Sequence, residues 1–404
     1  MIEFPKNFLW GAATSAYQVE GNNFNSDWWP WEKKTGLTES GDACRSYELF
    51  REDYDIAKAL GHNVHRLSVE WARIEPEEGI FSEKEIQHYK DVILALKERG
   101  IQPVVTLHHF TNPIWFFNIG GWENPKAAEY FRRFSEKIVS ALKNDVHFWV
   151  TINEPMVYLY FAYLSGNWPP QKKSLLAANR ALGNIIEAHV YSYRVINKIY
   201  KDNNLEKPLI SIAHNMQAFV ACRDNLKDKA AAFIRDKLFN RDIIKTLISR
   251  RSLDYIGLNY YSRSLVEVKR WGIMNFLGDV CESGHKSLKK NDMGWDIYPQ
   301  GIYGLLTELK VFKLPIFILE NGICAVDDNL KWEFIKEHLE YIHKAIGEGA
   351  NVLGYIYWSL LDNFEWDKGF WPRFGLVEVD YNTYQRRVRE SGKKFAEVCK
   401  TNRL

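Results

Sequence analysis

The fold is decided by NVHRLSV at 63–69, SEKEIQHYKDVILALKERG at 82–100 and QPVVTL at 102–107, which indicate a strand, a helix and a second strand. Ser82 and Glu85 form a capping box at the start of the central stretch, and apolar residues then recur on one helical face. A strand, a covering helix and another strand in this order are typical of a parallel sheet. The unit therefore predicts an α/β fold.

The same alternation continues through the whole chain, and we count eight buried-type runs, the number that closes a parallel barrel. A further helix is predicted to start with Asn124 as its cap and Pro125 as its first helical residue. No linker-like segment divides the chain, so we predict one (β/α)₈ TIM barrel domain over residues 1–404. The predicted strands are 8–13, 63–69, 102–107, 147–151, 208–213, 254–258, 316–319 and 352–358.

Composition and charge restrict the class of protein and the partners that we expect for it. Hydrophobic residues make up 46% of the chain and charged residues 26%, which is typical of a globular protein with a sizeable core. The formal net charge is +2 and both signs are interspersed, so we expect neither nucleic acid nor a membrane as a partner. The first residues lack the pattern of a secretory signal, and no segment is apolar enough to span a bilayer. We therefore expect a cytoplasmic protein.

The cysteine and histidine patterns predict no metal or cofactor. Adjacent strand residues such as His108 and His109 point to opposite faces, and no third ligand follows at a useful spacing. No GxGxxG motif follows the first strand, and His189 fits a hydrogen-bonded core position better than a catalytic one. Without any CxxC pair, we expect free thiols at all five cysteines, which are Cys44, Cys222, Cys281, Cys324 and Cys399.

Two predicted strands end in a glutamate. HFWVT leads into Asn153 and Glu154, and IFIL leads into Glu320 and Asn321. In a parallel barrel the carboxyl ends of all strands meet at one mouth, so these two carboxyl groups can face each other. Cleavage of a glycosidic bond needs one carboxyl group to protonate the leaving oxygen and a second facing the anomeric carbon. A lone strand-end glutamate could merely pair with an arginine, but two together favour glycoside hydrolysis.

Several motifs resemble glycoside hydrolase family 1, the β-glucosidases and related β-glycosidases. TINEP at 151–155 and LENG at 319–322 are similar to the two catalytic signatures of that family. The resemblance extends over nearly the whole chain, in the order of the family, through FLWGAATSAYQVEG at 8–21, HRLSVEWARIEP at 65–76, IGLNYYS at 256–262 and YWSLLDNFEWDKGFWPRFGLVEVDY at 357–381. It implies a retaining β-glycosidase that uses a two-step double displacement.

The resemblance implies roles for individual catalytic residues. Glu154 would be the general acid/base, and Glu320 would be the nucleophile that forms a covalent glycosyl-enzyme intermediate. Arg66 would keep Glu320 ionised, while a drier setting would raise the pKa of Glu154. Tyr261 would hold the carboxylate of the nucleophile, and Asn259 would support that group of residues.

The resemblance also implies a sugar-binding set. Asn153 would bind the sugar 2-hydroxyl and Trp358 would form a floor for the ring. The other residues implied for the nonreducing sugar are Gln18, His109, Glu365 and Trp366. The small substrate would be an unphosphorylated β-D-glycoside, because FWPR at 370–373 lacks the serine and lysine expected in enzymes for 6-phosphorylated sugars.

Other interpretations stay open. A carbohydrate-binding protein without turnover would not need both glutamates, and an inverting hydrolase would need a wider separation of the two carboxyl groups. A transglycosidase would share the covalent intermediate. Trp28, Trp29 and Trp31 fit a structural role better than a sugar platform. Glucosides, galactosides and fucosides are all compatible, and the chain is short for the family between the fifth and seventh predicted strands, where we expect a more open mouth.

Overall fold

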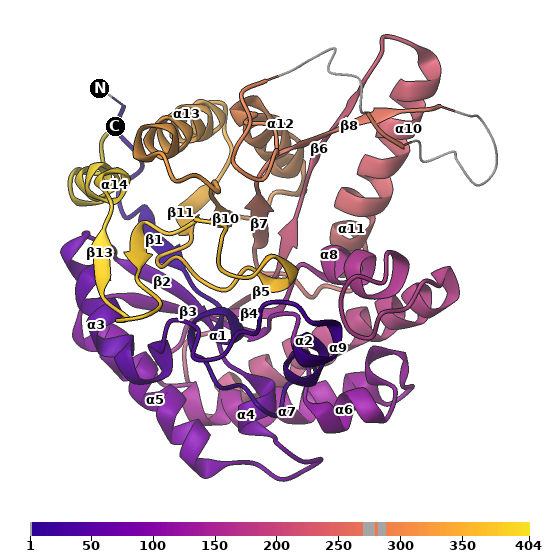
Figure 1. The fold of residues 1–404 in the computed structure, drawn as a ribbon, viewed down its shortest axis with the longest axis vertical. Helices are drawn as coiled ribbons and strands as arrows, with labels where there is room; N and C mark the ends of the chain where they lie inside the picture. Colours follow the sequence, from indigo (N-terminus) through magenta and orange to yellow (C-terminus); the bar gives the residue numbers. More distant parts are fainter. Residues whose placement is uncertain (1, 270–278, 282–287) are drawn as a thin grey trace.

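A closed barrel of eight parallel strands forms the centre of the protein (Figure 1). The computed structural model describes residues 2–269, 279–281 and 288–404. The strands close in the order β1-β11-β10-β7-β5-β4-β3-β2, and all eight predicted strands are among them, which confirms the predicted TIM barrel. Their bounds are β1 (Leu9–Ala13), β2 (Val64–Ser68), β3 (Gln102–His108), β4 (Phe148–Asn153), β5 (Leu209–Asn215), β7 (Ile256–Tyr260), β10 (Ile316–Asn321) and β11 (Val352–Trp358).

Helices surround the barrel and shield its outer face (Figure 1). The first seven are α1 (Ala16–Val19), α2 (Trp28–Thr35), α3 (Ser46–Ala59), α4 (Trp71–Ile74), α5 (Glu83–Glu98), α6 (Ile114–Asn118) and α7 (Ala127–Leu142). The others described are α8 (Pro155–Leu159), α9 (Leu175–Asp202), α10 (Leu226–Asp236), α11 (Asp242–Ser249), α12 (Pro299–Leu309), α13 (Asp328–Gly347) and α14 (Glu390–Thr401).

Side chains along each barrel strand alternate between two separate cores. Phe148, Val150 and Phe317 belong to a cluster inside the barrel, whereas Trp149 and Ile318 belong to the larger cluster between strands and helices. This is the period of two expected of a strand that is buried on both faces. The barrel is therefore a packed core whose mouth alone is left for chemistry.

Two helix starts test the sequence prediction, with different results. The Ser82 side chain accepts a hydrogen bond from the Glu85 backbone N–H at the start of α5, as the capping box predicts. The second prediction was wrong, because α7 begins at Ala127 and not at Pro125. The Asn124 side chain accepts from the Lys126 backbone N–H at 2.8 Å and so closes a turn before the helix. Asn and Asp favour such local turns as readily as helix caps.

A small sheet extends away from the barrel beside α10 (Figure 1). Its strands β6 (Ala218–Ala221), β8 (Arg263–Glu267) and β9 (Asp279–Val280) pair in the order β6-β8-β9. Cys222 and Cys281 form a disulfide at its end, so the expectation of five free thiols was wrong for these two residues. They lie 59 positions apart and meet only through this pairing, which no local spacing predicts. A second small sheet pairs β12 (Val377–Val379) with β13 (Arg386–Val388).

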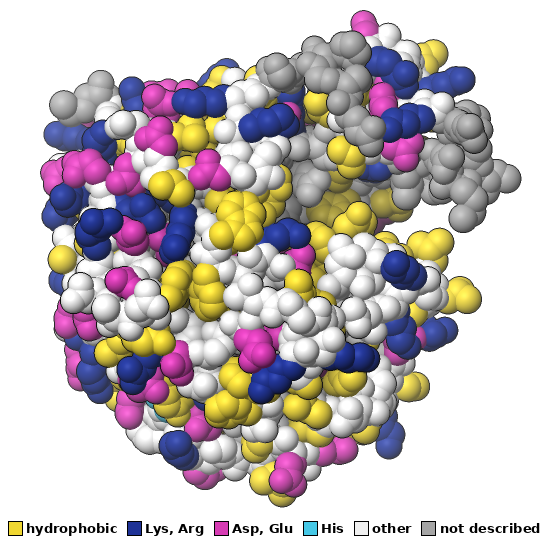
Figure 2. All heavy atoms as spheres, in the orientation of Figure 1, with side chains coloured by type: hydrophobic (Ala, Val, Ile, Leu, Met, Phe, Trp, Pro, Cys, Tyr) yellow, Lys and Arg dark blue, Asp and Glu magenta, His cyan; other side chains and the backbone are white. Residues whose placement is uncertain are grey.

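Two further observations concern membrane-spanning helices and the distribution of surface charge. None of the helices in the described parts of the chain combines the length and the apolar character needed to cross a bilayer. Basic and acidic side chains alternate over the face shown in Figure 2, and hydrophobic ones lie between them. The described part of that face has no extended field of one sign, in keeping with the net charge of +2.

Candidate active site

Both strand-end glutamates lie at the mouth of the barrel, and each follows an irregularity in its strand. Relative to β5, β4 has one extra residue between Val150 and Asn153, and relative to β7, β10 has one between Ile318 and Glu320. An extra residue reverses the alternation of side chains, which re-aims the residues after it. Leu319 still belongs to the inner cluster, so plain alternation would have turned Glu320 outward.

Local backbone geometry completes the placement of Glu154. Its φ angle is 44°, in the left-handed region, and it precedes helix α8, whose first residue is Pro155. The backbone N–H of Glu154 donates to the carbonyl of Ala213 on β5 at 2.7 Å. Left-handed backbone is costly for a non-glycine residue and is concentrated at functional sites. Glu154 and Glu320 are 6% and 3% exposed, so both carboxyl groups are withdrawn from bulk water.

Glu320 is held by a cation and a phenol. The Arg66 guanidinium, from β2, donates to Oε1 of Glu320, and the Tyr261 hydroxyl donates to Oε2. Arg66 is itself 1% exposed and also donates to Asn153 Oδ1 at 2.7 Å and to Thr106 Oγ1 at 3.0 Å. Both oxygens of Glu320 are therefore fixed, and a positive charge lies against one of them. These contacts match the positions that the sequence predicted for Arg66 and Tyr261.

Glu154 is held by neutral amides instead. Asn259 donates to its Oε1 at 2.8 Å, and Asn215 donates to the same oxygen at 3.0 Å. Burial, and next the nearby charge of Glu320, raise the pKa of Glu154 to about 8. Asn259 was expected to support the residues around Glu320. Its amide donates to Glu154 and to Asn153 Oδ1, which also accepts from Arg66, so it reaches the Glu320 side through Asn153. Its strand, β7, lies between β5 and β10, within reach of either glutamate.

Asn215 is a site residue that the sequence reasoning missed. It closes the apolar fifth strand, as Glu154 and Glu320 close theirs, so the rule that identified the glutamates applies to it as well. The strand was predicted to end at residue 213, two positions before the observed end of β5. A polar residue at the true end of that run was the available signal.

Asn153 and His109 form the next part of the site. Asn153 Nδ2 and His109 Nε2 are 3.2 Å apart, and Asn153 Oδ1 accepts from Arg66. Burial, and next the charge of Arg66, lower the pKa of His109 well below its usual range, so its ring is neutral. The ring of His109 is stacked against Trp358 and Trp366, with centroids 5.9 and 6.1 Å away. A polar edge and an aromatic wall thus meet here.

Gln18 and Glu365 lie on the far side of the same cluster. Gln18 Nε2 donates to Glu365 Oε2 at 3.2 Å, and the Gln18 side chain is fully buried. Burial, and next the charges of Glu320 and Glu154, raise the pKa of Glu365 to about 8. The charges of Glu320 and Glu154 act on Glu365, so the three carboxyl groups lie close enough to influence one another's pKa. The structure therefore brings all the predicted site residues to the barrel mouth.

The tryptophan cluster near residue 30 contributes to the wall behind the site. Trp28 is fully buried, and its ring centroid lies 4.8 Å from that of Trp366 and 5.4 Å from that of Trp168. Trp31 is also buried and packs edge-on against Trp28 at 4.8 Å. Trp28 thus packs directly against Trp366 and Trp31 packs against Trp28, in agreement with the structural role predicted for these two residues.

The histidines outside the site have ordinary partners. His189 is buried, with Nδ1 2.6 Å from Thr151 Oγ1 and Nε2 2.7 Å from the carbonyl of Ser252, which confirms it as a hydrogen-bonded core residue. His108 Nε2 lies 3.1 Å from Asn112 Oδ1, away from His109's partners. Among the described residues, the group close enough to share a cation consists of Cys222, Glu267 and Cys281, on the small sheet.

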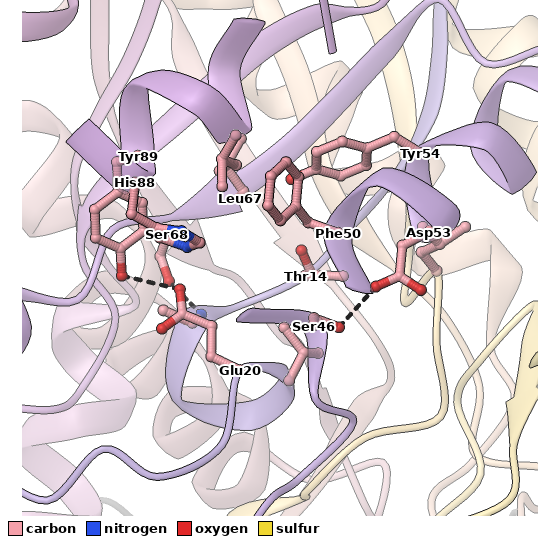
Figure 3. A pocket seen from close by; sticks show the side chains of 14 residues that line it. Thr14, Glu20, Ser46, Phe50, Asp53, Tyr54, Leu67, Ser68, His88 and Tyr89 are labelled. Carbon is pink, nitrogen blue, oxygen red and sulfur yellow. Dashed lines mark hydrogen bonds between the residues drawn. The ribbon is translucent and has the colours of Figure 1, made fainter. Parts of the chain in front are cut away.

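A small buried cavity lies between α3, α5 and the first two strands, outside the barrel (Figure 3). Its volume is about 30 Å³, roughly the space of one water molecule. The two carboxylates on its wall have protein partners: Tyr89 donates to Glu20 at 2.9 Å and Ser46 to Asp53 at 2.8 Å. The cavity is too small for a sugar, and it is part of the packing of the barrel wall.

Comparisons with known proteins agree with this geometry. The model of a family described as "Glycosyl hydrolase family 1" matches residues 1–250 and 242–404. Beta-glucosidase A of Thermotoga maritima is 32% identical, with 100% of this chain and 99% of the relative covered. The beta-galactosidase of Pyrococcus woesei is 31% identical, with 99% and 97% covered. Both alignments are longer than the 404-residue chain, so both relatives have segments that this chain lacks.

The likeness extends to solved structures. A beta-glycosidase from Pyrococcus horikoshii superimposes with a TM-score of 0.93 at 38% identity, covering 100% of this chain and 96% of the other. The shared architecture spans the entire barrel, including the strand ends that carry Glu154 and Glu320.

Proposed function

Because the chain belongs to glycosyl hydrolase family 1 and is a retaining β-glycosidase, we propose that Glu320 is its nucleophile and Glu154 its general acid/base. The observation that carries this proposal is the contrast between the two carboxyl groups. One is paired with Arg66 and Tyr261, and the other is buried among neutral amides with a pKa of about 8. A pair of carboxyl groups in unlike surroundings is the arrangement that separates nucleophile from acid.

In the first step an oxygen of Glu320 attacks the anomeric carbon and the glycosidic bond breaks. The leaving oxygen takes the proton of Glu154, which is protonated at neutral pH because its pKa is about 8. Asn215 and Asn259 both donate to Oε1, so the proton is carried by Oε2. The products of this step are the free leaving group and a glycosyl ester of Glu320.

In the second step Glu154 accepts a proton from water, and the water oxygen attacks the anomeric carbon. Esterification removes the negative charge of Glu320, which is the second cause of the raised pKa of Glu154. The pKa of Glu154 therefore falls when the intermediate forms, and the group changes from acid to base. Breaking the ester returns the carboxylate to Arg66, and two inversions restore the β configuration.

The substrate is an unphosphorylated β-D-glycoside, in our proposal, with the sugar between Gln18, Glu365, His109 and Asn153. Their donors and acceptors suit sugar hydroxyls, and Trp358 and Trp366 suit the C–H face of a pyranose ring. The carboxyl group of Glu365, once ionised, repels a phosphate. Glucosides, galactosides and fucosides differ by single hydroxyls that such a set accepts with modest discrimination. The enzyme acts in the cytoplasm on small glycosides, without nucleic acid or membrane as a partner, and the reaction at the barrel mouth uses no metal or cofactor.

Proton NMR of the first sugar released from an aryl β-glycoside tests the proposal. We expect the β anomer to appear first and the α anomer to follow by mutarotation. The α anomer appearing first would show direct attack by water and overturn the nucleophilic role of Glu320. Adding an alcohol to the same assay measures how much glycosyl-enzyme is transferred to an acceptor in place of water, which separates hydrolysis from transglycosylation.

A further inference from the structure

The small sheet brings three potential metal ligands to one face. Ala221 of β6 pairs with Val266 of β8, so Cys222 lies beside Glu267. The backbone N–H of Cys281 donates to the carbonyl of Leu265 at 2.9 Å, which places Cys281 beside a residue two positions before Glu267. Residues two apart on a strand share a face. The opposite face carries Val266 and packs against α10 through Ala231 and Ala232.

The three side chains converge closely. One ligand atom from each of Cys222, Glu267 and Cys281 lies within 4.8 Å of the other two. Cys222 and Glu267 are 3% and 7% exposed, and Cys281 is half-buried. A tetrahedral zinc ion with bonds of roughly 2.3 Å to sulfur and 2.0 Å to oxygen needs ligand atoms at about this spacing. Small side-chain adjustments would bring all three around one ion.

The buried carboxylate of Glu267 is not explained by the disulfide. A disulfide is neutral, so it does not stabilise a buried anion beside it. In the described part of the chain Glu267 forms an ion pair with Lys269, whose Nζ is 3.6 Å away and whose side chain is 45% exposed, and the charge of Arg223 also interacts with it. Buried charges are normally paired or bound to a metal. Two thiolates and a carboxylate form a donor set suited to Zn²⁺.

We propose that Cys222, Cys281 and Glu267 form a Zn²⁺-binding site when the disulfide is reduced. A dithiol reductant transfers two electrons to the S–S bond, which gives two thiols and the oxidised form of the reductant. Zn²⁺ then displaces the two thiol protons and binds two thiolates, the Glu267 carboxylate and a water molecule. The disulfide and the zinc ion are alternative cross-links between the ends of β6 and β9, selected by the redox state.

The site has a structural consequence near the barrel mouth. Strand β6 begins at Ala218, three residues after Asn215, whose side chain contacts Glu154. Either cross-link fastens this extension of the barrel rim to the rest of the small sheet. A ligand that binds only the folded state stabilises it in proportion to the logarithm of its concentration over Kd. Reduced protein should therefore become more heat-resistant when Zn²⁺ is added.

The test measures Zn²⁺ and Co²⁺ binding by the full-length protein after reduction with a dithiol and removal of the excess. We expect one equivalent of Zn²⁺ by equilibrium dialysis, a thiolate charge-transfer absorption with Co²⁺, and a higher Tm. The oxidised protein should lack all three. Glu267→Gln should weaken Zn²⁺ binding at least about 10-fold, since even indirect partners of a metal contribute 10- to 100-fold. Cys222→Ser should abolish the Co²⁺ absorption.

Cys399→Ser is the matched control, because Cys399 is a buried thiol on α14, remote from the sheet, and its loss should leave binding unchanged. The proposal is overturned if the reduced protein binds no Zn²⁺, if the oxidised protein binds it equally well, or if Glu267→Gln binds as tightly as the parent. A disulfide that resists reduction in the folded protein also overturns it. Tm values of the metal-free variants separate loss of a ligand from loss of folding.

Discussion

The two carboxyl groups of the active site have different kinds of hydrogen-bond partner, which defines a Glu320 side and a Glu154 side. On the Glu320 side a buried arginine and a tyrosine hydroxyl each bind one carboxylate oxygen. On the Glu154 side two asparagine amides share one oxygen, and no cation is among the hydrogen-bond partners of this carboxyl group in the described chain. Both groups are almost fully buried, so burial alone does not distinguish them. Their hydrogen-bond partners distinguish them.

This difference gives the two carboxyl groups different roles in the proposed reaction. A formal cation beside Glu320 stabilises the carboxylate that attacks, whereas neutral donors leave burial dominant at Glu154 and its pKa near 8. Asn153 connects the sides, because its Oδ1 accepts from Arg66 and from Asn259. The predictions below alter one side at a time.

Removal of the nucleophile should have the largest effect. Glu320→Gln keeps the shape of the side chain but cannot form the glycosyl ester. We expect kcat to fall by at least about 10⁴-fold on every aryl β-glycoside, as for other enzymes that lose a covalent nucleophile. Steady-state kinetics measures the loss, and a retained Tm shows that the fold is intact. A loss below 10-fold would contradict the role.

Glu154→Gln should have the next largest effect, and its size should depend on the leaving group. Poor leaving groups need the proton, so their kcat/KM should fall about 10²- to 10⁴-fold, while activated aryl glycosides lose far less. The parent should show a basic limb near pH 8, because Glu154 loses its proton there, and this limb should vanish in the variant. A limb that persists at pH 8 would assign it to Glu365, whose pKa is also about 8.

Arg66→Met should affect stability as well as turnover. It leaves the Glu320 carboxylate buried without its cation, at a cost of about 3–5 kcal/mol in the free energy of unfolding. The double variant Arg66→Met with Glu320→Gln removes both charges and should recover part of that loss. Denaturant unfolding of the parent, both single variants and the double variant measures the coupling. Additive losses would show that the pair is not coupled.

Asn215→Ala should have the smallest effect of these changes. It removes one of two donors to Glu154 Oε1, and each of these hydrogen bonds lowers the pKa of that group. The basic limb should therefore move to higher pH, with a change in kcat below about 10-fold. Asn259→Ala should move it in the same direction. A limb that shifts to lower pH in either variant would show that the amide contacts do not stabilise the ionised form.

Local patterns were sufficient for the barrel and for the two strand-end glutamates, because buried strands and polar strand ends can be recognised in the sequence itself. The other candidate site residues came from the resemblance to glycoside hydrolase family 1. It did not predict the extra residues in β4 and β10, which turn Asn153, Glu154 and Glu320 into the mouth. Bulges are seen only in the register between strands.

Contacts between distant segments were the other limit. Asn259 could reach either glutamate from β7, and only the relative positions of three strands decide that it binds Glu154. The Cys222–Cys281 disulfide depends likewise on the pairing of β6, β8 and β9.

The most direct test of the division between the two sides is to trap the intermediate. A 2-fluoro β-glycoside with an activated leaving group slows both steps but hydrolysis of the ester most, so the glycosyl-enzyme accumulates. Peptide mass spectrometry then locates the label. The account predicts one fluorosugar per chain, on the peptide that contains Glu320 and at that carboxyl group. A label on Glu154 or on any other residue would contradict it.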